Sequence, residues 1–316
     1  MLNFFLTDIN NKTTHVTDIV SFELARSIDT ACDGLRLSFI SEHLLDEIVK
    51  VTVYNDTEII FNGYADTQRE TADERGWAAF IYARSSACLL TDNEAKPVTY
   101  SCPSAFSLYY QNARQFGFGC DFPYLYCDYD YQVGKGVSCY GAINDFVRGI
   151  TGYNIVVDPY DVIKLASPNT VAKIDKNCVM SEKRTVNRGN LVTCIDYKAT
   201  GDSGYDHHLK SRYLEQQKIN KQQKINLSTL PDWQKEFTVK NRLYSLCKDY
   251  YTVELMLRGY HHFDLYNKVN YNGDRIGRCE DYYVSKIVVK NGDGGCVTKI
   301  TLNKNIDMQE INYVVK

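Results

Sequence analysis

Apolar and polar residues alternate with a period of two along the first part of the chain, from residue 2 to about residue 84. This alternation is typical of strands that bury one face. The predicted strands are 20–26, 35–40, 49–54, 59–66 and 77–83. Turn-forming residues such as Asp33-Gly34 and Asn55-Asp56 separate them. An antiparallel β barrel or sandwich is therefore expected for residues 1–92.

The alternation fades in the middle of the chain, where five of the six prolines lie between Pro97 and Pro168. The elements predicted here are helices at 104–116 and 138–150 and a hairpin formed by 153–158 and 162–166. Ser138 stands at the start of the second helix, where its hydroxyl can accept a hydrogen bond from an N–H of the first turn. Residues 93–175 are therefore predicted to form a small α+β domain.

Strand patterns return after about Asn177. The predicted elements are extended chain at 184–198, a helix at 233–249, and strands at 252–258, 268–271, 281–289 and 297–302. A polar stretch at 201–228 contains Gln-Gln-Lys-Ile-Asn twice, and its composition favours a helical or flexible excursion. Residues 176–316 are therefore expected to form a second β domain with a helical and polar insertion at about 201–250.

The two β-rich parts repeat one series of elements, a strand followed by a long twisted hairpin. The matched segments are 51–54, 60–66 and 77–83 in the first part and 269–271, 281–287 and 297–302 in the second. Internal duplication would let the two domains of a chain occupy equivalent places in a ring, so that three chains present six similar units. Chance similarity between two hairpins is the alternative interpretation.

Length and charge narrow the classes of function. The chain has 316 residues, 44% of them hydrophobic, which is enough for two or three domains with real cores. A formal net charge of −3 gives no electrostatic footprint for nucleic-acid binding. No segment is long and apolar enough to cross a bilayer, and residues 1–8 lack the basic start and cleavage pattern of a signal peptide. We therefore expect neither nucleic-acid binding nor membrane insertion.

The cysteines indicate a reducing compartment. There are 11 of them, spread along the chain with no Cys-x-x-Cys spacing, and most lie in apolar periodic segments. Free thiols buried as small hydrophobic side chains are expected in preference to a disulfide framework. The chain is accordingly expected to be made and folded in a cytoplasm.

Two histidine pairs are candidate metal ligands: His207-His208 near Asp206, and His261-His262 near Asp264. Neighbouring residues of a strand point to opposite faces, so each pair would offer one imidazole to a face, too few for a metal site. No metal-binding residue is therefore predicted.

The Tyr-rich segment 118–131 carries Asp121, Asp128 and Asp130 between and beside Cys120 and Cys127. Such a loop can grip a glycan or a calcium ion, but this spacing matches no standard site, and a surface loop is expected.

Sequence motifs of catalysis are missing. The chain has no Gly-x-Ser-x-Gly, no His-Glu-x-x-His and no paired carboxylates in the context of a muramidase. We therefore expect no enzyme, with no catalytic or cofactor-binding residues and no cofactor.

The segment Ile19-Val-Ser-Phe-Glu-Leu-Ala-Arg-Ser-Ile-Asp-Thr-Ala-Cys-Asp-Gly-Leu-Arg-Leu-Ser-Phe resembles the opening of the phage baseplate hub family, which includes the hub of contractile Mu-like phages and the late-control D proteins. Further similar segments are Val51-Thr-Val-Tyr, Gly63-Tyr-Ala-Asp, Ala83-Arg-Ser-Ser-Ala-Cys-Leu-Leu, the segment 134–143, and the last hairpin at 283–289 and 294–302. The resemblance spans most of the chain except about 201–235. The polar stretch 201–228 and the segment 274–279 depart from the family pattern.

The resemblance implies a homotrimer in which two tube-type β domains per chain form a pseudo-sixfold ring. Such a ring joins the sixfold tail tube to the threefold central spike, so the implied partners are the tail tube protein, the spike protein and other baseplate proteins. Pairing of sheet edges between neighbouring subunits would satisfy their N–H and C=O groups and close the ring. The implied destination is the baseplate of a virion or of a phage-tail-like particle such as an R-type bacteriocin, after synthesis in a bacterial cytoplasm.

Two other functions stay open at this point. One is a tail-associated cell-wall hydrolase or carbohydrate-binding component that uses the loop 118–131 as its binding patch. The other is the hub of a non-contractile phage tail, which would share the fold. The polar stretch 201–228 is expected to order only against a neighbouring tail protein, because it has few apolar residues.

Overall fold

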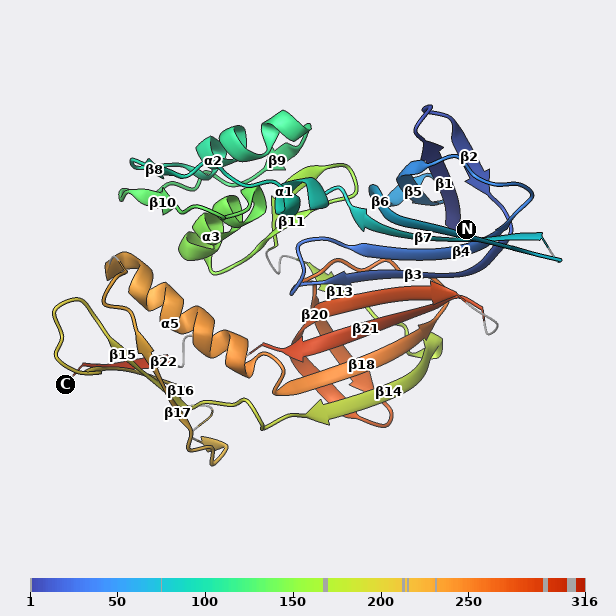
Figure 1. Ribbon diagram of the computed structural model, residues 1–316. Coiled ribbons are helices and arrows are strands. Elements are labelled where there is room, and N and C mark those ends of the chain that lie inside the picture. Colours follow the sequence, from blue (N-terminus) through green and yellow to red (C-terminus); the bar gives the residue numbers. More distant parts are fainter. Residues whose placement is uncertain are drawn as a thin grey trace.

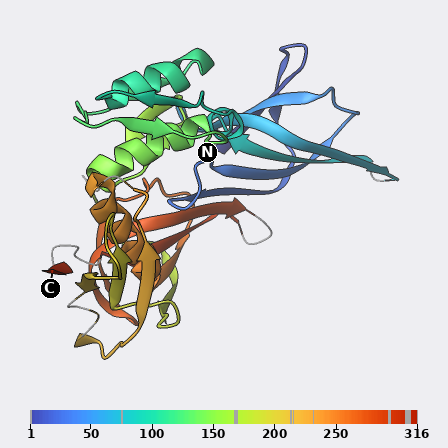
Figure 2. The same ribbon diagram turned by 60° about the vertical axis from the view of Figure 1, so that its left-hand side comes forward.

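A computed structural model describes residues 2–74, 76–166, 170–211, 214, 216–230, 232–291, 295–305 and 311–315. Most of the strands among them join one large, curled sheet of 13 strands (Figure 1). The helices lie at one side of this sheet, in two separate groups (Figures 1 and 2). None of the described helices has the length and apolarity needed to span a membrane. The predicted β-rich α+β class is confirmed.

The first part of the chain contains only strands. They are β1 (Leu2–Asp8), β2 (Thr13–Val16), β3 (Ile19–Ser27), β4 (Gly34–Ser41), β5 (Ile48–Asn55), β6 (Glu58–Asp73) and β7 (Gly76–Ser85). Alternate residues are buried in most of these strands, as Leu35, Leu37 and Phe39 are in β4, whereas β2 buries only Val16 and β6 buries the consecutive residues 60–63. The five predicted strands are confirmed, because the apolar face of each one packs into the core.

The middle part combines short strands with helices. Its elements are α1 (Cys88–Asp92), β8 (Val98–Tyr100), α2 (Ala105–Asn112), the 3₁₀ turn η1 (Arg114–Phe116), β9 (Gly119–Asp121), β10 (Tyr131–Val133), α3 (Cys139–Thr151), β11 (Ile155–Val157) and β12 (Val162–Leu165). Ser138 caps α3, since its hydroxyl accepts a hydrogen bond from the N–H of Gly141 at 3.0 Å. Gly152, at φ 77°, ends α3 in the left-handed region. Both predicted helices and the hairpin are confirmed.

The last part alternates between the large sheet and a separate unit. Its elements are β13 (Val171–Ala172), the 3₁₀ turn η2 (Lys176–Cys178), β14 (Val179–Val186), β15 (Cys194–Lys198), β16 (His207–Ser211), β17 (Gln222–Asn226), α5 (Asp232–Cys247), β18 (Tyr251–Arg258), β19 (Lys268–Gly273), β20 (Gly277–Asn291), β21 (Val297–Lys304) and β22 (Ile311–Val315). The predicted helix and the four last strands are confirmed. The tip of the last hairpin, at 292–294, lies outside the described residues.

The expected helical or flexible excursion at 201–228 is wrong for residues 207–211 and 222–226, which are strands. Two strands of this stretch, β16 and β17, flank β15 in a sheet of four strands, and α5 packs on that sheet (Figure 1). Leu209, Leu214, Ile219 and Leu227 are buried together with Leu243 of α5. The apolar residues of the stretch are few, but long-range pairing collects them into one core. The extended chain predicted at 184–198 is two strands, β14 and β15, in different sheets.

The two β-rich parts share one hydrophobic core. Leu37 and Ile81 of the first part and Leu255 and Ile300 of the second belong to the same cluster, and each is 0% exposed. Within the sheet the parts meet where β3 pairs antiparallel with β20.

The order of strands in the sheet repeats. The first part has the order β3-β4-β7-β6-β5-β1, and the second has β14-β18-β21-β20-β19-β13. Successive strands are antiparallel throughout the first series, including the final pair of β1 on β5. In the second series only the final pair differs, because β13 is parallel to β19. The long hairpins β6–β7 and β20–β21 point the same way, to the right in Figures 1 and 2.

Irregularities of the ladders repeat as well. The register between β6 and β7 shifts between Ala65 and Thr67, and that between β20 and β21 shifts between Val284 and Lys286. The register of β3 on β4 shifts after Ile19, and that of β14 on β18 shifts after Val179. β-Bulges are specific local features. Their recurrence at matching places is therefore stronger evidence that the two parts are related than strand order alone.

Candidate functional site

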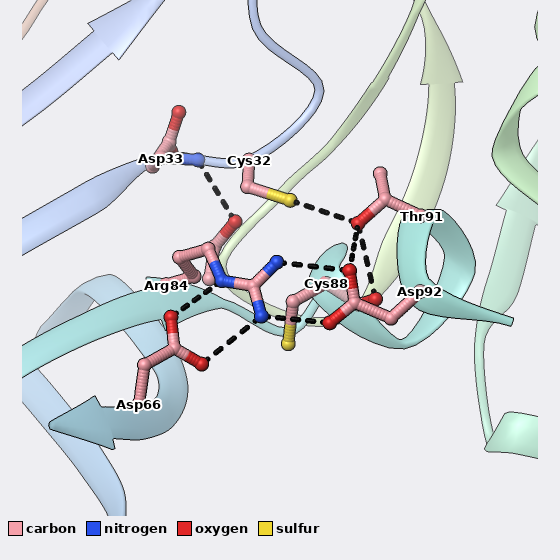
Figure 3. A network of polar contacts seen from close by, with 8 residues as sticks. Cys32, Asp33, Asp66, Arg84, Cys88, Thr91 and Asp92 are labelled. Atoms are coloured by element: carbon pink, nitrogen blue, oxygen red, sulfur yellow. Dashed lines mark hydrogen bonds and ion pairs between the residues drawn. The ribbon is translucent and has the colours of Figure 1, made fainter.

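The bulge of β6 is held by an arginine. Arg84, near the end of β7, binds the bulge residue Asp66 with one side of its guanidinium and Asp92, the last residue of α1, with the other (Figure 3). The Nη2 atom lies 3.0 Å from Oδ1 of Asp66 and 2.7 Å from Oδ2 of Asp92. This forked geometry is the strong form of an arginine–carboxylate contact. The hydrogen bond from Arg84 holds the pKa of the Asp92 carboxyl below its usual range.

Two thiols border this contact without becoming reactive. The Sγ atom of Cys32 lies 3.6 Å from Oγ1 of Thr91, and Cys88 lies beside Arg84 (Figure 3). Burial raises the pKa of Cys32 and raises that of Cys88 to about 11. A thiol with a raised pKa carries little thiolate and is a poor nucleophile. The Arg84 network therefore fixes the joint between the first β part and the helices.

A second network stands at the matching place of the second β part. Ser285 is the bulge residue of β20, and its hydroxyl donates to Oδ1 of Asn303 at 2.7 Å. Asn303 donates onward to Asp249, which follows α5, at 3.2 Å. Arg84 pairs with Tyr64 two residues before its bulge, and Asn303 pairs with Tyr283 two residues before its own. Each β part thus links its bulge to a neighbouring helix.

His207 and His208 contact opposite faces of the small sheet. The ring of His207 stacks on Tyr197 at 4.9 Å between centroids, whereas Nδ1 of His208 lies 2.7 Å from Oδ1 of Asp196. The ligand atoms of Cys194, Asp196 and His208 lie within 4.8 Å of one another, the one group of potential metal ligands found among the described residues.

Sequence reasoning missed Cys194 and Asp196. Their spacing of two on a strand put them on one face, but the register that brings His208 opposite Asp196 is a long-range feature. Thiol, carboxylate and imidazole are ligand types of zinc. In this structure Asp196 accepts a hydrogen bond from Cys194 at 3.1 Å in addition to its contact with His208, and these contacts account for the cluster without a metal.

His261 and His262 lie in the loop between β18 and β19, so the strand geometry assumed for this pair is wrong. Nε2 of His261 is 2.8 Å from the carbonyl oxygen of Arg258. Nε2 of His262 lies 3.6 Å from Oδ1 of Asp264, and this neighbouring carboxylate raises the pKa of His262. Both histidines line a cavity of about 370 Å³, and within the described part of the chain neither joins a group of three potential ligands.

The three aspartates of the segment 118–131 do not form a cluster among the described residues. Asp130 accepts a hydrogen bond from Ser101 at 2.9 Å, and Asp121 ends β9. The aromatic side chains do gather: the rings of Tyr124 and Tyr126 are 5.6 Å apart, and Tyr124 is 84% exposed.

All the cysteines are free thiols, as predicted. Six of them are buried as expected, four are partly buried, and Cys102 is exposed. Cys102 has a positive φ of 44° in the turn before α2, where its side chain finds no core to enter.

Comparison with known proteins relies on structure. No family model and no curated protein matches the sequence. The structure is similar to the 43 kDa tail protein of prophage MuSo2 from Shewanella oneidensis, with a TM-score of 0.77, 12% identity, and coverage of 96% of this chain and 98% of that one. It is also similar to a tail protein from Neisseria meningitidis MC58, with a TM-score of 0.75, 10% identity, and coverage of 98% of both chains.

A third similar structure is an E. coli component of the type VI secretion system, described as structurally similar to the T4 bacteriophage tail proteins gp27 and gp5. The TM-score is 0.56 at 8% identity, over 91% of this chain and 74% of that one. The resemblance read from the sequence is thus confirmed at the level of structure: this chain has the fold of phage tail proteins.

Proposed function

We propose that this chain is a structural subunit of a tail hub, which joins the tail tube to the central spike of a phage or of a phage-tail-like particle. Likeness over nearly the whole length of two tail proteins supports a structural role in a tail. Among the described residues, the networks at the two bulges link strands to helices, and the thiols beside Arg84 have raised pKa values that make them poor nucleophiles. These contacts support a structural role.

The observation that carries the proposal is the repeated strand order with its repeated bulges. Two β units of common ancestry in one chain would let a homotrimer present six similar units around one axis. A ring of that kind can meet a sixfold tube on one side and a threefold spike on the other.

The proposed domains follow from this duplication. Residues 1–92 form the first tube-type domain, 93–175 the small α+β domain, and 176–316 the second tube-type domain with its insertion. The proposed partners are a second and third copy of the chain, the tail tube protein, the spike protein and other baseplate proteins. The proposal covers contractile and non-contractile tails alike.

Sizing the purified protein and assaying it on cell walls tests this proposal. We expect a trimer by light scattering and no clearing of peptidoglycan. A monomer that clears cell walls would reverse the assignment in favour of a tail-associated hydrolase.

One observation favours a second candidate, carbohydrate binding by the segment 118–131. Tyr124, Tyr126 and Tyr129 are 84%, 55% and 56% exposed, and exposed aromatic rings can stack on sugar rings. Glycan binding by the intact protein that is lost in Tyr124→Ala would support this candidate, and retained binding would remove it.

A further inference from the structure

Within one chain the two β parts are joined where β3 pairs with β20, and this pairing predicts how two chains pair with each other. Inside the chain, the edge of β20 is shared: residues 277–283 pair with β19, and residues 286–291 pair with β3. The matching strand β6 pairs with β5 only as far as Tyr64, and its described residues 67–73 pair with β7 alone. The outer half of β6 therefore has no partner strand on this edge among the described residues, although the side chains of Gln68 and Glu70 there bind the backbone of residues 45–48.

β14, the strand that corresponds to β3, also has an edge without a partner strand in the described sheet. β3 lies between β4 and β20, whereas its counterpart β14 pairs only with β18 and ends the described sheet. Within the chain β3 pairs with β20, whereas their counterparts, β14 and the outer half of β6, each have an edge without a partner strand in the part of the chain that the structure describes. Unpaired N–H and C=O groups along a strand edge are a template for another strand.

We infer that β14 of one chain pairs antiparallel with residues 67–72 of β6 in a second copy of this chain, in the register that β3 has on β20. This inference rests on the proposed ring of like subunits and names the strands that make it.

The register follows from rows of paired residues that cross each β part. The row of the first part is Glu23, Arg36, Tyr82 and Thr67, and the corresponding row of the second part is Lys183, Glu254, Thr301 and Lys286. Both rows end at the residue directly after the bulge. Glu23 therefore corresponds to Lys183, and Thr67 corresponds to Lys286.

Transferring the intrachain pairs gives the pairs between chains. Leu24 opposite Val289 becomes Arg184 opposite Glu70, and Ala25 opposite Val288 becomes Thr185 opposite Arg69. The intrachain pair Leu24 and Val289 is apolar and buried, at 4% and 3% exposure. Its counterpart between chains is a pair of opposite charges, which attract across antiparallel strands.

This exchange of apolar for charged residues fits a joint that is exposed before assembly. An edge that stays in water until a partner arrives must not aggregate, and charged residues on edge strands prevent that. Arg184 is exposed, and no hydrogen bond or ion pair connects it to the described residues. Glu70 accepts hydrogen bonds from Gln68 and from the N–H of Leu45, and a carboxylate has further lone pairs for a guanidinium.

Val186, near the end of β14, adds apolar contact area and is 43% exposed in the single chain. The inferred register places it opposite Gln68 of the second chain, because Arg26 lies opposite Ile287 within the chain.

A disulfide between chains tests the register. Opposite residues of antiparallel strands have Cα atoms about 4.5–5.5 Å apart, which a disulfide can bridge. Arg69→Cys with Thr185→Cys should give cross-linked dimers and trimers under mild oxidation, with the 69–185 linkage found by peptide mass spectrometry. Arg69→Cys with Ser181→Cys is the matched control, since position 181 lies about 13 Å further along the same face. Linkage of the control pair in preference to the first would overturn the inferred register.

Charge reversal tests the same contact without cysteines. Arg184→Glu should weaken self-association about tenfold for each interface, and the swap Arg184→Glu with Glu70→Arg should restore part of it. Lys135→Glu makes the same change of charge at an exposed residue away from both edges and should leave association unchanged.

The outcomes separate this inference from the proposed function. A trimer without the 69–185 linkage, and with no effect of Arg184→Glu, would contradict the inference and leave the proposed trimer standing. A chain that stays monomeric at its highest attainable concentration would contradict both.

Discussion

The two β parts of this chain have the same strand order and differ in what their loops contain. In the first part, β3 and β4 are joined by the short turn 28–33. In the second part, the corresponding strands β14 and β18 are separated by residues 187–250, which build a sheet and a helix with a core of their own. An insertion of this size leaves the strand order around it unchanged, because long surface insertions cost little loop-closure free energy.

The bulge networks differ in their chemistry. The first part uses a charged contact, Arg84 between Asp66 and Asp92, at the surface. The second part uses the neutral pair Ser285 and Asn303, which is 5% and 3% exposed. A buried charge is costly to desolvate, so a neutral pair suits the buried position and a charged one the half-exposed position. Both parts keep the bulge and its link to a helix, while the polarity of the side chains that make the link differs with their exposure.

The largest expected effect is a loss of stability when a buried leucine of the shared core is shortened in either β part. Leu37→Ala and Leu255→Ala stand at corresponding positions of β4 and β18, and each should lower the free energy of unfolding by about 2–5 kcal/mol. Because both residues belong to one core, hydrogen exchange should speed up in β4 and β18 in either variant. Ile40→Ala, at an exposed position of β4, is the control and should cost less than about 1 kcal/mol. Deprotection confined to the mutated part would show two independent cores.

A second prediction concerns a glycine that only the first part requires. A Cβ atom at Gly63 would come within 2.1 Å of the carbonyl oxygen of Arg84, while the corresponding residue on the ladder, Tyr282, carries a full side chain. Gly63→Ala should therefore cost about 1–3 kcal/mol in urea unfolding, because the backbone of β7 has to move. Gly34→Ala meets nothing nearer than 3.8 Å and should be tolerated. Equal costs for the two variants would refute this distinction.

The third prediction uses pH to separate the two networks. The pKa of Asp92 is lowered in the folded chain by the hydrogen bond from Arg84, so its contribution to stability is present above the unfolded pKa of about 4 and is lost as the pH falls through the folded value. Arg84→Gln should cost about 1 kcal/mol at neutral pH, since the contact is half-exposed, and less at acid pH. Ser285→Ala breaks a bond between a hydroxyl and an amide, which do not titrate, and its cost should stay constant. Parallel pH profiles for the two variants would contradict this account.

The smallest expected effect is on thiol labelling. Exposed Cys102 should react first with a maleimide, and Cys88 should react slowly because burial raises its pKa to about 11. Counting labelled peptides over time in the native protein checks this order. Rapid labelling of Cys88 would mean that the joint around Arg84 opens in solution.

Much of the fold could be predicted from local patterns. Leu35, Leu37 and Phe39 show the period of β4 directly, and Ser138 and Gly152 mark both ends of α3. These signals are readable because burial on one face and capping act over a few residues.

The missed features depend on contacts between distant residues. β16 and β17 become strands because β15 lies between them, and the polar composition of 201–228 conceals the few residues that enter the core. Gly63, Asp66 and Arg84 were noted within the family resemblance, but their roles depend on how β6 is paired with β7. A register is set by the whole sheet, and one sequence gives little warning of a bulge.

A three-dimensional reconstruction of the assembled particle of purified chains, by electron microscopy, tests the central claim most directly. The account predicts a closed ring of six similar β units contributed by three chains, with β14 of each chain beside β6 of the next. A ring in which each chain contributes a single unit, or an assembly in which these two strands lie apart, would contradict it.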